Sequence, residues 1–307
     1  MKKIICFNIL LLTLLFSGCA GKQEIQKIQP THDTEMPESR ETEIIEQDYN
    51  DNTDTDADAI DVSNTITEEI DLSDKFRGIN GCAVIYDLEN NKYSIYNTSL
   101  SEQEMSPYST FKIVSTLAGL SNGVIENETS TMNYQGVQYP VAEWNEDLTL
   151  EEAFQTSCIW FFRQIIDKVG SAEMQNELQK LEYGNCDISE WNGSNLNPMR
   201  ELNGFCLDSS LKISPLEQVQ VLKRIFEGES IYSDEHVAVL KEIMLVSDDT
   251  KKIYGKTGSG SNGEACFVGF TEENEQRVYF AVYLNDHTQL DKVSGGVARE
   301  IAVEILL

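Results

Sequence analysis

The sequence predicts an α/β domain of the α+β type, with an antiparallel sheet formed by both ends of the domain and helices flanking it. Two short runs of β-type composition, 81–87 and 92–96, are separated by four turn-forming residues and predict a hairpin. A second pair of such runs, 265–270 and 277–284, lies near the C-terminal end. The chain between the two pairs has mostly helical patterns, so a helical insertion is expected there.

Capping signals mark individual helices. Thr149-Leu-Glu-Glu152 is a capping box and predicts a helix that continues through Ile166. Ser214-Pro-Leu-Glu217 is a second capping box, with proline at the first helical position. Apolar residues recur at helical spacing over 293–307, which predicts a helix at the end of the domain.

The composition excludes several function classes. The chain has 307 residues, with 23 Lys and Arg against 52 Asp and Glu, and a formal net charge of −29. A nucleic-acid-binding protein needs a basic face, and an acidic chain is also not drawn to an anionic membrane by charge. The three histidines include no pair at a spacing of four, so no metal site is expected.

The first 18 residues predict the signal peptide of a lipoprotein. Lys2 and Lys3 precede an apolar core, Ile4–Phe16, that is short for a permanent membrane span. Small residues then lead to Cys19, in a pattern that resembles a bacterial lipobox. Cys19 is therefore expected to be lipidated and to anchor the protein to the membrane, outside the cytoplasm. The alternatives are an ordinary signal peptide cut elsewhere, or a short anchor that is retained.

Residues 19–75 are expected to be a disordered acidic tether, and 76–307 the folded domain. Residues 20–75 contain 17 acids and 4 bases, hence −13 of the net charge, and Tyr49 is their only aromatic residue. Such a segment buries too little apolar surface to offset chain entropy. The alternating acids at 51–58 suggest a calcium loop, but the glycine and closing glutamate of such a loop are missing.

Ser109 and Lys112 are the first candidate catalytic pair, in Pro107-Tyr-Ser-Thr-Phe-Lys-Ile113. A spacing of three places both side chains on one face of a helix. A serine hydroxyl becomes a nucleophile when a base takes its proton, and a lysine is such a base once burial makes its amine neutral. Taken alone this S-x-x-K pattern is common.

Further motifs occur downstream in a fixed order: Ser157-Cys158-Ile159, Tyr183-Gly-Asn185 and Lys256-Thr257-Gly258. Together with 107–112 and the 209–218 segment, they resemble class D (oxacillinase-type) serine β-lactamases and the related penicillin-sensor domains of β-lactam receptors. The resemblance covers about 78–307. It implies the serine β-lactamase/transpeptidase-like fold and a penicillin-binding site.

The resemblance also implies roles for individual residues. Ser109 would form an acyl-enzyme with a β-lactam, and Lys112, carboxylated on its nitrogen by CO₂ or bicarbonate, would be the general base. Ser157 would relay a proton and Lys256 would supply positive charge beside it. Backbone N–H groups of Ser109 and Ser259 would form the oxyanion hole. The substrate-binding set would be Thr257, Gly258, Ser259 and Ile159, with Ile159 packed over the carbamate. No other cofactor is implied.

Two positions depart from the family pattern. Cys206 aligns with a tryptophan that usually donates a hydrogen bond to the carboxylated lysine, and a thiol is a weaker donor than an indole. Ser294 aligns with an arginine that usually binds the substrate carboxylate, although Lys292 and Arg299 are near in sequence. Both departures predict less efficient hydrolysis and leave the acylation chemistry in place.

Five cysteines remain when Cys6 and Cys19 are set aside, and an odd number leaves at least one free thiol. No spacing selects a disulfide. The leading hypothesis is a membrane-anchored class D β-lactamase that hydrolyses β-lactam antibiotics. A sensor-like lipoprotein that stays acylated and a peptidoglycan transpeptidase are the alternatives, and the oligomeric state is open.

Overall fold

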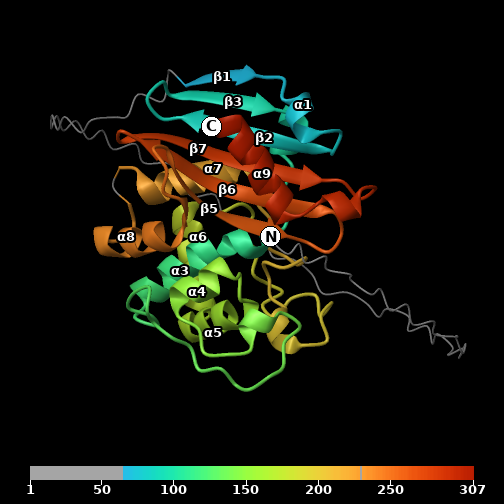
Figure 1. The fold of residues 1–307 in the computed structure, drawn as a ribbon. Coiled ribbons are helices and arrows are strands. Elements are labelled where there is room, and N and C mark those ends of the chain that lie inside the picture. Colours follow the sequence, from blue (N-terminus) through green and yellow to red (C-terminus); the bar gives the residue numbers. More distant parts are fainter. Residues whose placement is uncertain (1–64, 229) are drawn as a thin grey trace, which may run out of the picture. The chain divides into compact units, whose positions relative to one another are not determined.

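The fold is organised around one mixed sheet (Figure 1). The computed structural model describes residues 65–228 and 230–307. Within them the strand order is β1-β3-β2-β7-β6-β5-β4, and every neighbouring pair is antiparallel except β1 and β3. The strands are β1 (Ile66–Glu69), β2 (Gly81–Asp87), β3 (Lys92–Tyr96), β4 (Leu245–Ser247), β5 (Lys252–Ser259), β6 (Glu264–Glu273) and β7 (Gln276–Asn285).

The predicted sheet is confirmed. Strands β2 and β3 form the first hairpin, with Ala83 opposite Tyr96, and β6 and β7 form the second, with Cys266 opposite Tyr283. β2 then pairs with β7, so the two ends of the domain meet at the middle of the sheet. The second hairpin is longer than its apolar runs, because the ladder extends through charged residues at its tip.

The folded part begins before residue 76, earlier than the composition predicts. Strand β1 pairs in parallel with β3, and α1 (Ser73–Phe76) places the Phe76 ring in the core. All four side chains of β1 are exposed, so the strand is held by backbone pairing and has no apolar signature. The proposed signal peptide, Cys19 and most of the tether lie outside the described residues. The chain divides into two units, 1–58 and 59–307.

Helices cover both faces of the sheet. On one face α9 (Gly295–Leu306) packs on β5, β6 and β7, and Ala298, Ile301 and Ala302 are buried there. On the other face a larger core joins the sheet to the remaining helices, which form a layer beside it in Figure 1. These are α2 (Thr98–Ser101), α3 (Lys112–Ser121), α4 (Leu150–Gln155), α5 (Ile159–Val169), α6 (Ser171–Leu181), α7 (Pro215–Phe226) and α8 (Asp234–Ile243).

Both capping boxes are present, but one predicted helix is divided. Ser214 caps α7 with Pro215 at the first position, as expected. Thr149 caps α4, yet that helix ends at Gln155, and α5 starts at Ile159. The expectation of a continuous helix through Ile166 is therefore wrong. The break occurs because Ser157 has a φ of 57°, which ends the helical hydrogen-bond pattern.

None of the helices in the described residues is both long and apolar enough to cross a bilayer. The five cysteines of the folded part, at 82, 158, 186, 206 and 266, are all free thiols. Within the same described residues, no three His, Cys, Asp or Glu side chains are grouped to hold a metal ion.

Candidate active site

Ser109 lies in a short 3₁₀ turn, Tyr108–Phe111, that leads directly into α3 at Lys112. In a 3₁₀ turn the side chains at positions i and i+3 eclipse one another. The Lys112 Nζ accordingly donates a hydrogen bond to the Ser109 Oγ over 2.9 Å. Phe111 and Ile113 are buried on either side of the lysine, so the core holds the turn in place.

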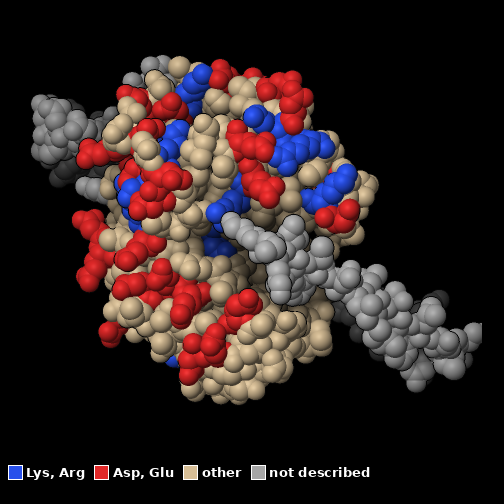
Figure 2. Space-filling view, in the orientation of Figure 1, with Lys and Arg blue, Asp and Glu red and all other residues tan. Residues whose placement is uncertain are grey.

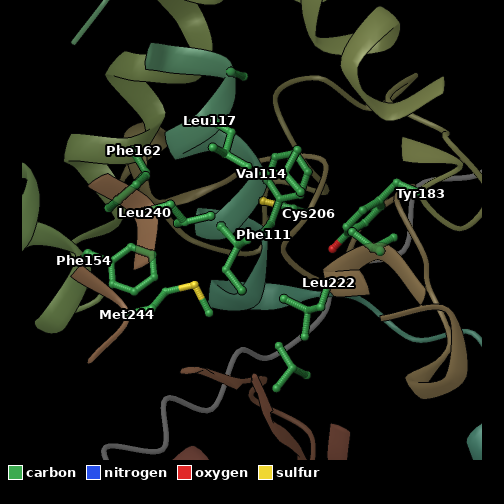
Figure 3. Close-up of a cluster of buried hydrophobic side chains, with 14 of the residues drawn as sticks. Phe111, Val114, Leu117, Phe154, Phe162, Tyr183, Cys206, Leu222, Leu240 and Met244 are labelled. Atoms are coloured by element: carbon green, nitrogen blue, oxygen red, sulfur yellow. The ribbon is translucent and has the colours of Figure 1, made fainter. Parts of the chain in front are cut away.

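Lys112 is 4% exposed, and burial lowers the pKa of its amine to about 8. The nearby thiols of Cys206 and Cys158 act in the opposite direction on this pKa, and burial raises the pKa of each thiol to about 11. Figure 3 shows Cys206 in the buried cluster beside Phe111. The lysine therefore has an apolar environment in which its neutral form is readily populated.

A cavity of about 20 Å³ adjoins Lys112. Its walls are mostly apolar, and they include Phe111, Ile159, Phe162 and Cys206. The alignment of Cys206 with a residue near the lysine is thus matched by its position in the fold. Phe162 lies with its ring centroid 5.3 Å from the Lys112 Nζ.

Ser157 lies in the break between α4 and α5, and Lys256 on β5 donates a hydrogen bond to its Oγ. The same amine also contacts the Thr257 carbonyl oxygen over 3.2 Å. Lys256 is 4% exposed, and burial, followed by the charge of Lys112, lowers its pKa to about 7. Residues 99 positions apart are therefore joined at one point.

Strand β5 passes close to the start of the turn that holds Ser109 because residue 258 is glycine. A Cβ at Gly258 would lie 2.8 Å from the Cys266 Sγ and 3.1 Å from the Pro107 carbonyl oxygen. Thr257 beside it is half-buried, and Ser259 is exposed. The Ser259 Oγ accepts a hydrogen bond from the Gly295 N–H over 2.9 Å, which links the strand to the start of α9.

The structure also places the residues considered for the substrate carboxylate. Ser294 caps α9 through its hydroxyl, and the exposed Lys292 donates to Gln289. Arg299, one turn further along α9, lines a groove of about 350 Å³ together with Lys256 and Thr257. None of the described residues lining that groove carries a carboxyl group.

Two side chains of the site were missed by the sequence analysis. The Phe154 ring lies 5.5 Å from the Lys256 Nζ, so each buried lysine has an aromatic neighbour. Its position three residues before Ser157 was the available signal. Tyr108 is the second, and it directly precedes the S-x-x-K motif, whose pattern gives no role to that position.

This arrangement of fold and site agrees with that of known proteins. The family model described as the penicillin binding protein transpeptidase domain matches residues 81–307. The chain therefore belongs to this family, and the predicted resemblance and fold class are confirmed.

Among its relatives are a probable β-lactamase and a regulatory protein. The chain is 31% identical to the probable β-lactamase YbxI of Bacillus subtilis, over 78% of this chain and 84% of that protein. It is 34% identical to the regulatory protein BlaR1 of Bacillus licheniformis, over 76% of this chain. The match spans 37% of that BlaR1 and 39% of the Staphylococcus aureus one, so the chain covers less than half of these relatives.

Solved structures show the same two kinds of neighbour. The class D β-lactamase of Bacillus subtilis superposes with a TM-score of 0.69 at 31% identity, covering 77% of this chain and 94% of that chain. The C-terminal domain of the Bacillus licheniformis BlaR penicillin receptor superposes with a TM-score of 0.70 at 32% identity, covering 79% and 96%.

Proposed function

We propose that this protein is a class D β-lactamase that opens β-lactams through an acyl-enzyme on Ser109 and then hydrolyses that ester. The observation that carries the proposal is the hydrogen bond from the buried Lys112 amine to the Ser109 hydroxyl. An amine whose pKa is lowered to about 8 is partly neutral at physiological pH, which a general base requires. The relatives named as β-lactamases support the same chemistry.

The acylation step uses groups that are already in contact. The Ser109 Oγ attacks the lactam carbonyl carbon while its proton passes to the neutral Lys112 amine. As the lactam C–N bond breaks, the ring nitrogen takes a proton from the Ser157 hydroxyl, which is replaced by one from Lys256. The proton on Lys112 then passes to Lys256, which restores both amines. Neutral Lys112 takes a proton from the water that attacks the ester carbonyl carbon, and it returns that proton to the Ser109 Oγ as the ester C–O bond breaks and the penicilloic-type acid leaves.

Carboxylation of Lys112 is part of the proposal. A carbamate forms on a neutral amine, and the apolar cavity beside Lys112 supplies the environment that favours neutrality. When formed, the group would supply a carboxylate-like base close to Ser109. Cys206 is the polar neighbour on that side, and a thiol donates a weak hydrogen bond. These residues would therefore hold the group loosely, so we expect deacylation to depend on added bicarbonate.

The charge of the groove supports an anionic substrate. Figure 2 shows acidic side chains over much of one face of the domain and basic side chains at its centre. Lys256 and Arg299 line a groove without a described acid, in a chain whose net charge is −29. We infer that Lys256, Thr257 and Ser259 bind the carboxylate of the β-lactam, and that Arg299 takes the place of the arginine that Ser294 has replaced.

A sensor-like protein that stays acylated is the second candidate, favoured by the BlaR1 relatives and by Cys206 beside Lys112. Purified protein is mixed with benzylpenicillin, and its mass is followed over hours with and without bicarbonate. Turnover with loss of the adduct supports the hydrolase, whereas an adduct that persists in bicarbonate supports the sensor. Ser109→Ala is the control and should never gain the adduct, and a wild-type protein that gains none would overturn both candidates.

We also propose that Cys19 is lipidated after removal of 1–18 and that the acidic segment holds the domain away from the membrane. The support is the sequence pattern: a positive start, a short apolar core and a small residue before the cysteine. Attachment of more than one acyl chain gives a stable anchor.

A further inference from the structure

Tyr108, the residue before the nucleophile, has an unusual conformation and a buried position. Its φ is 51°, in the left-handed region that non-glycine residues seldom adopt, and its side chain is 4% exposed. Its backbone N–H donates to the carbonyl oxygen of Cys206 over 3.0 Å. A bulky residue keeps such a backbone conformation only where surrounding contacts impose it.

The Tyr108 phenol supplies those contacts. Its hydroxyl donates to the Asp208 Oδ1 over 2.6 Å and also meets the Glu264 Oε2. Asp208 follows the segment that contains Cys206, whereas Glu264 opens β6. One phenolic proton thus serves two carboxylates, and one side chain joins the nucleophile turn to two segments that are far apart in sequence.

The turn between β5 and β6 is shaped to receive this ring. A Cβ at Gly260 would lie 2.4 Å from the Tyr108 Cζ and from its hydroxyl oxygen. Any larger residue at 260 would push the phenol off its partners. The large residue at 108 and the glycine at 260 are therefore complementary parts of one contact.

The ring also forms part of the wall of a groove of about 270 Å³. Ile159, Leu202 and Leu207 supply apolar surface to this groove, and Ser259 and Gly260 border it. The cationic groove with Lys256 and Arg299 has a different lining. In a β-lactam the carboxylate and the acylamino side chain are attached to different ring carbons. A carboxylate bound by Lys256 and Thr257 leaves the apolar groove for the acyl side chain.

We propose that Tyr108 is a positioning residue that sets the width of the acyl side-chain groove. It does so by holding the 204–208 segment against the β5–β6 turn. The resulting width selects against β-lactams with bulky acyl groups. The inference rests on the proposed acylation of Ser109. Tyr108 acts through the groove walls and carries no proton in the reaction.

The test is a ratio of two acylation rates. Second-order acylation constants are measured for full-length protein with benzylpenicillin and with the penicillin that bears a 2,6-dimethoxyphenyl group. Tyr108→Phe keeps the ring and loses the hydroxyl contacts with Asp208 and Glu264. The acylation constant for the bulky penicillin divided by that for benzylpenicillin should therefore rise at least fivefold. Glu264→Gln can donate an amide N–H to the phenol oxygen while the phenol donates to Asp208, so its ratio should stay within twofold of wild type.

Tyr279→Phe is the matched control, because Tyr279 is also buried and its hydroxyl also donates to a carboxylate, Glu227, away from this groove. Its ratio should not change. If Tyr108→Phe fails to fold, the Asp208→Ala, Glu264→Ala double variant removes the same ties with the ring in place. A ratio within twofold of wild type in the folded variant overturns the inference. Wild-type protein that neither penicillin acylates overturns the proposed function instead.

Discussion

At the scale of single residues, two buried lysines are the basis of the proposed chemistry. Lys112 and Lys256 are each 4% exposed, and each lies beside an aromatic ring and a serine hydroxyl. Burial lowers both pKa values, because an ammonium group loses hydration in the core. Both lysines titrate in the range where an enzyme works, and Lys256 does so below Lys112, so the form with neutral Lys112 and protonated Lys256 is a minor one that is most populated between the two pKa values.

The two pKa values predict a bell-shaped pH profile for acylation. The base requires neutral Lys112, with a pKa of about 8, and the proton relay requires protonated Lys256, with a pKa of about 7. In CO₂-depleted buffer the acylation constant should therefore have its maximum between pH 7 and 8. Lys256→Arg should lose the alkaline limb, because arginine stays charged. An alkaline limb unchanged in that variant would contradict the assignment.

Lys112 should also make stability depend on pH. Its folded pKa of about 8 is below the ordinary 10.5, so the unfolded chain binds the proton more tightly. The resulting loss of folding free energy is complete below about pH 8 and disappears as the pH rises to 10.5. It amounts to ~3 kcal/mol at ~1.4 kcal/mol per pH unit. Lys112→Met should be more stable than wild type in urea at pH 7 by up to this amount, with a smaller difference at pH 10; equal differences would argue against it.

At the scale of elements, the break between α4 and α5 shows how packing overrides a local pattern. The capping box at Thr149 and the apolar residues after Phe154 favour one continuous helix. The left-handed backbone at Ser157 ends it, and the serine then lies against Lys256. By leaving the helix, Ser157 gains a hydrogen bond with Lys256 on β5. The residues next to Ser157 in the sequence give no sign of this distant partner.

The approach of β5 to the nucleophile turn gives a prediction for Gly258. In Gly258→Ala the new Cβ would lie 2.8 Å from the Cys266 Sγ and 3.1 Å from a backbone carbonyl, so β5 must move away from Ser109. Acylation should fall at least a hundredfold, measured as adduct formation by mass. Gly296→Ala is the matched control, since its Cβ meets only the Ser294 Oγ at 3.6 Å. Retained acylation in Gly258→Ala would show that the strand tolerates the shift.

At the scale of the whole molecule, charge is divided between two parts with different tasks. Residues 20–75 carry −13 of the net −29, and acidic side chains cover much of the face of the folded domain shown in Figure 2. Total charge therefore argues against a nucleic-acid partner and says little about the substrate. The substrate is indicated by local charge at Lys256 and Arg299, which a sum over the chain conceals.

The proposed anchor predicts that loss of Cys19 changes where the protein is found in the cell and leaves its acylation unchanged. Cys19→Ser removes the thiol that would be lipidated, so the protein should leave the membrane fraction when cells are fractionated. Its acylation constant for benzylpenicillin should match that of the wild type, since Ser109 and its partners lie in the unit formed by 59–307. A variant that stays in the membrane fraction would show that another segment holds the chain there.

The sequence by itself determined the Ser109–Lys112 pair, both hairpins and the cap of α7, because each depends on residues a few positions apart. The family resemblance already predicted Lys256 beside Ser157 and Cys206 near Lys112. Only the tertiary structure decided that Ser157 leaves its helix to make its contact, and that Tyr108 joins three segments. The physical reason is the distance along the chain over which each kind of interaction acts. Capping, alternation and 3.6-residue spacing express local hydrogen bonding and burial, whereas contacts across a hundred residues depend on how the sheet and helices pack together.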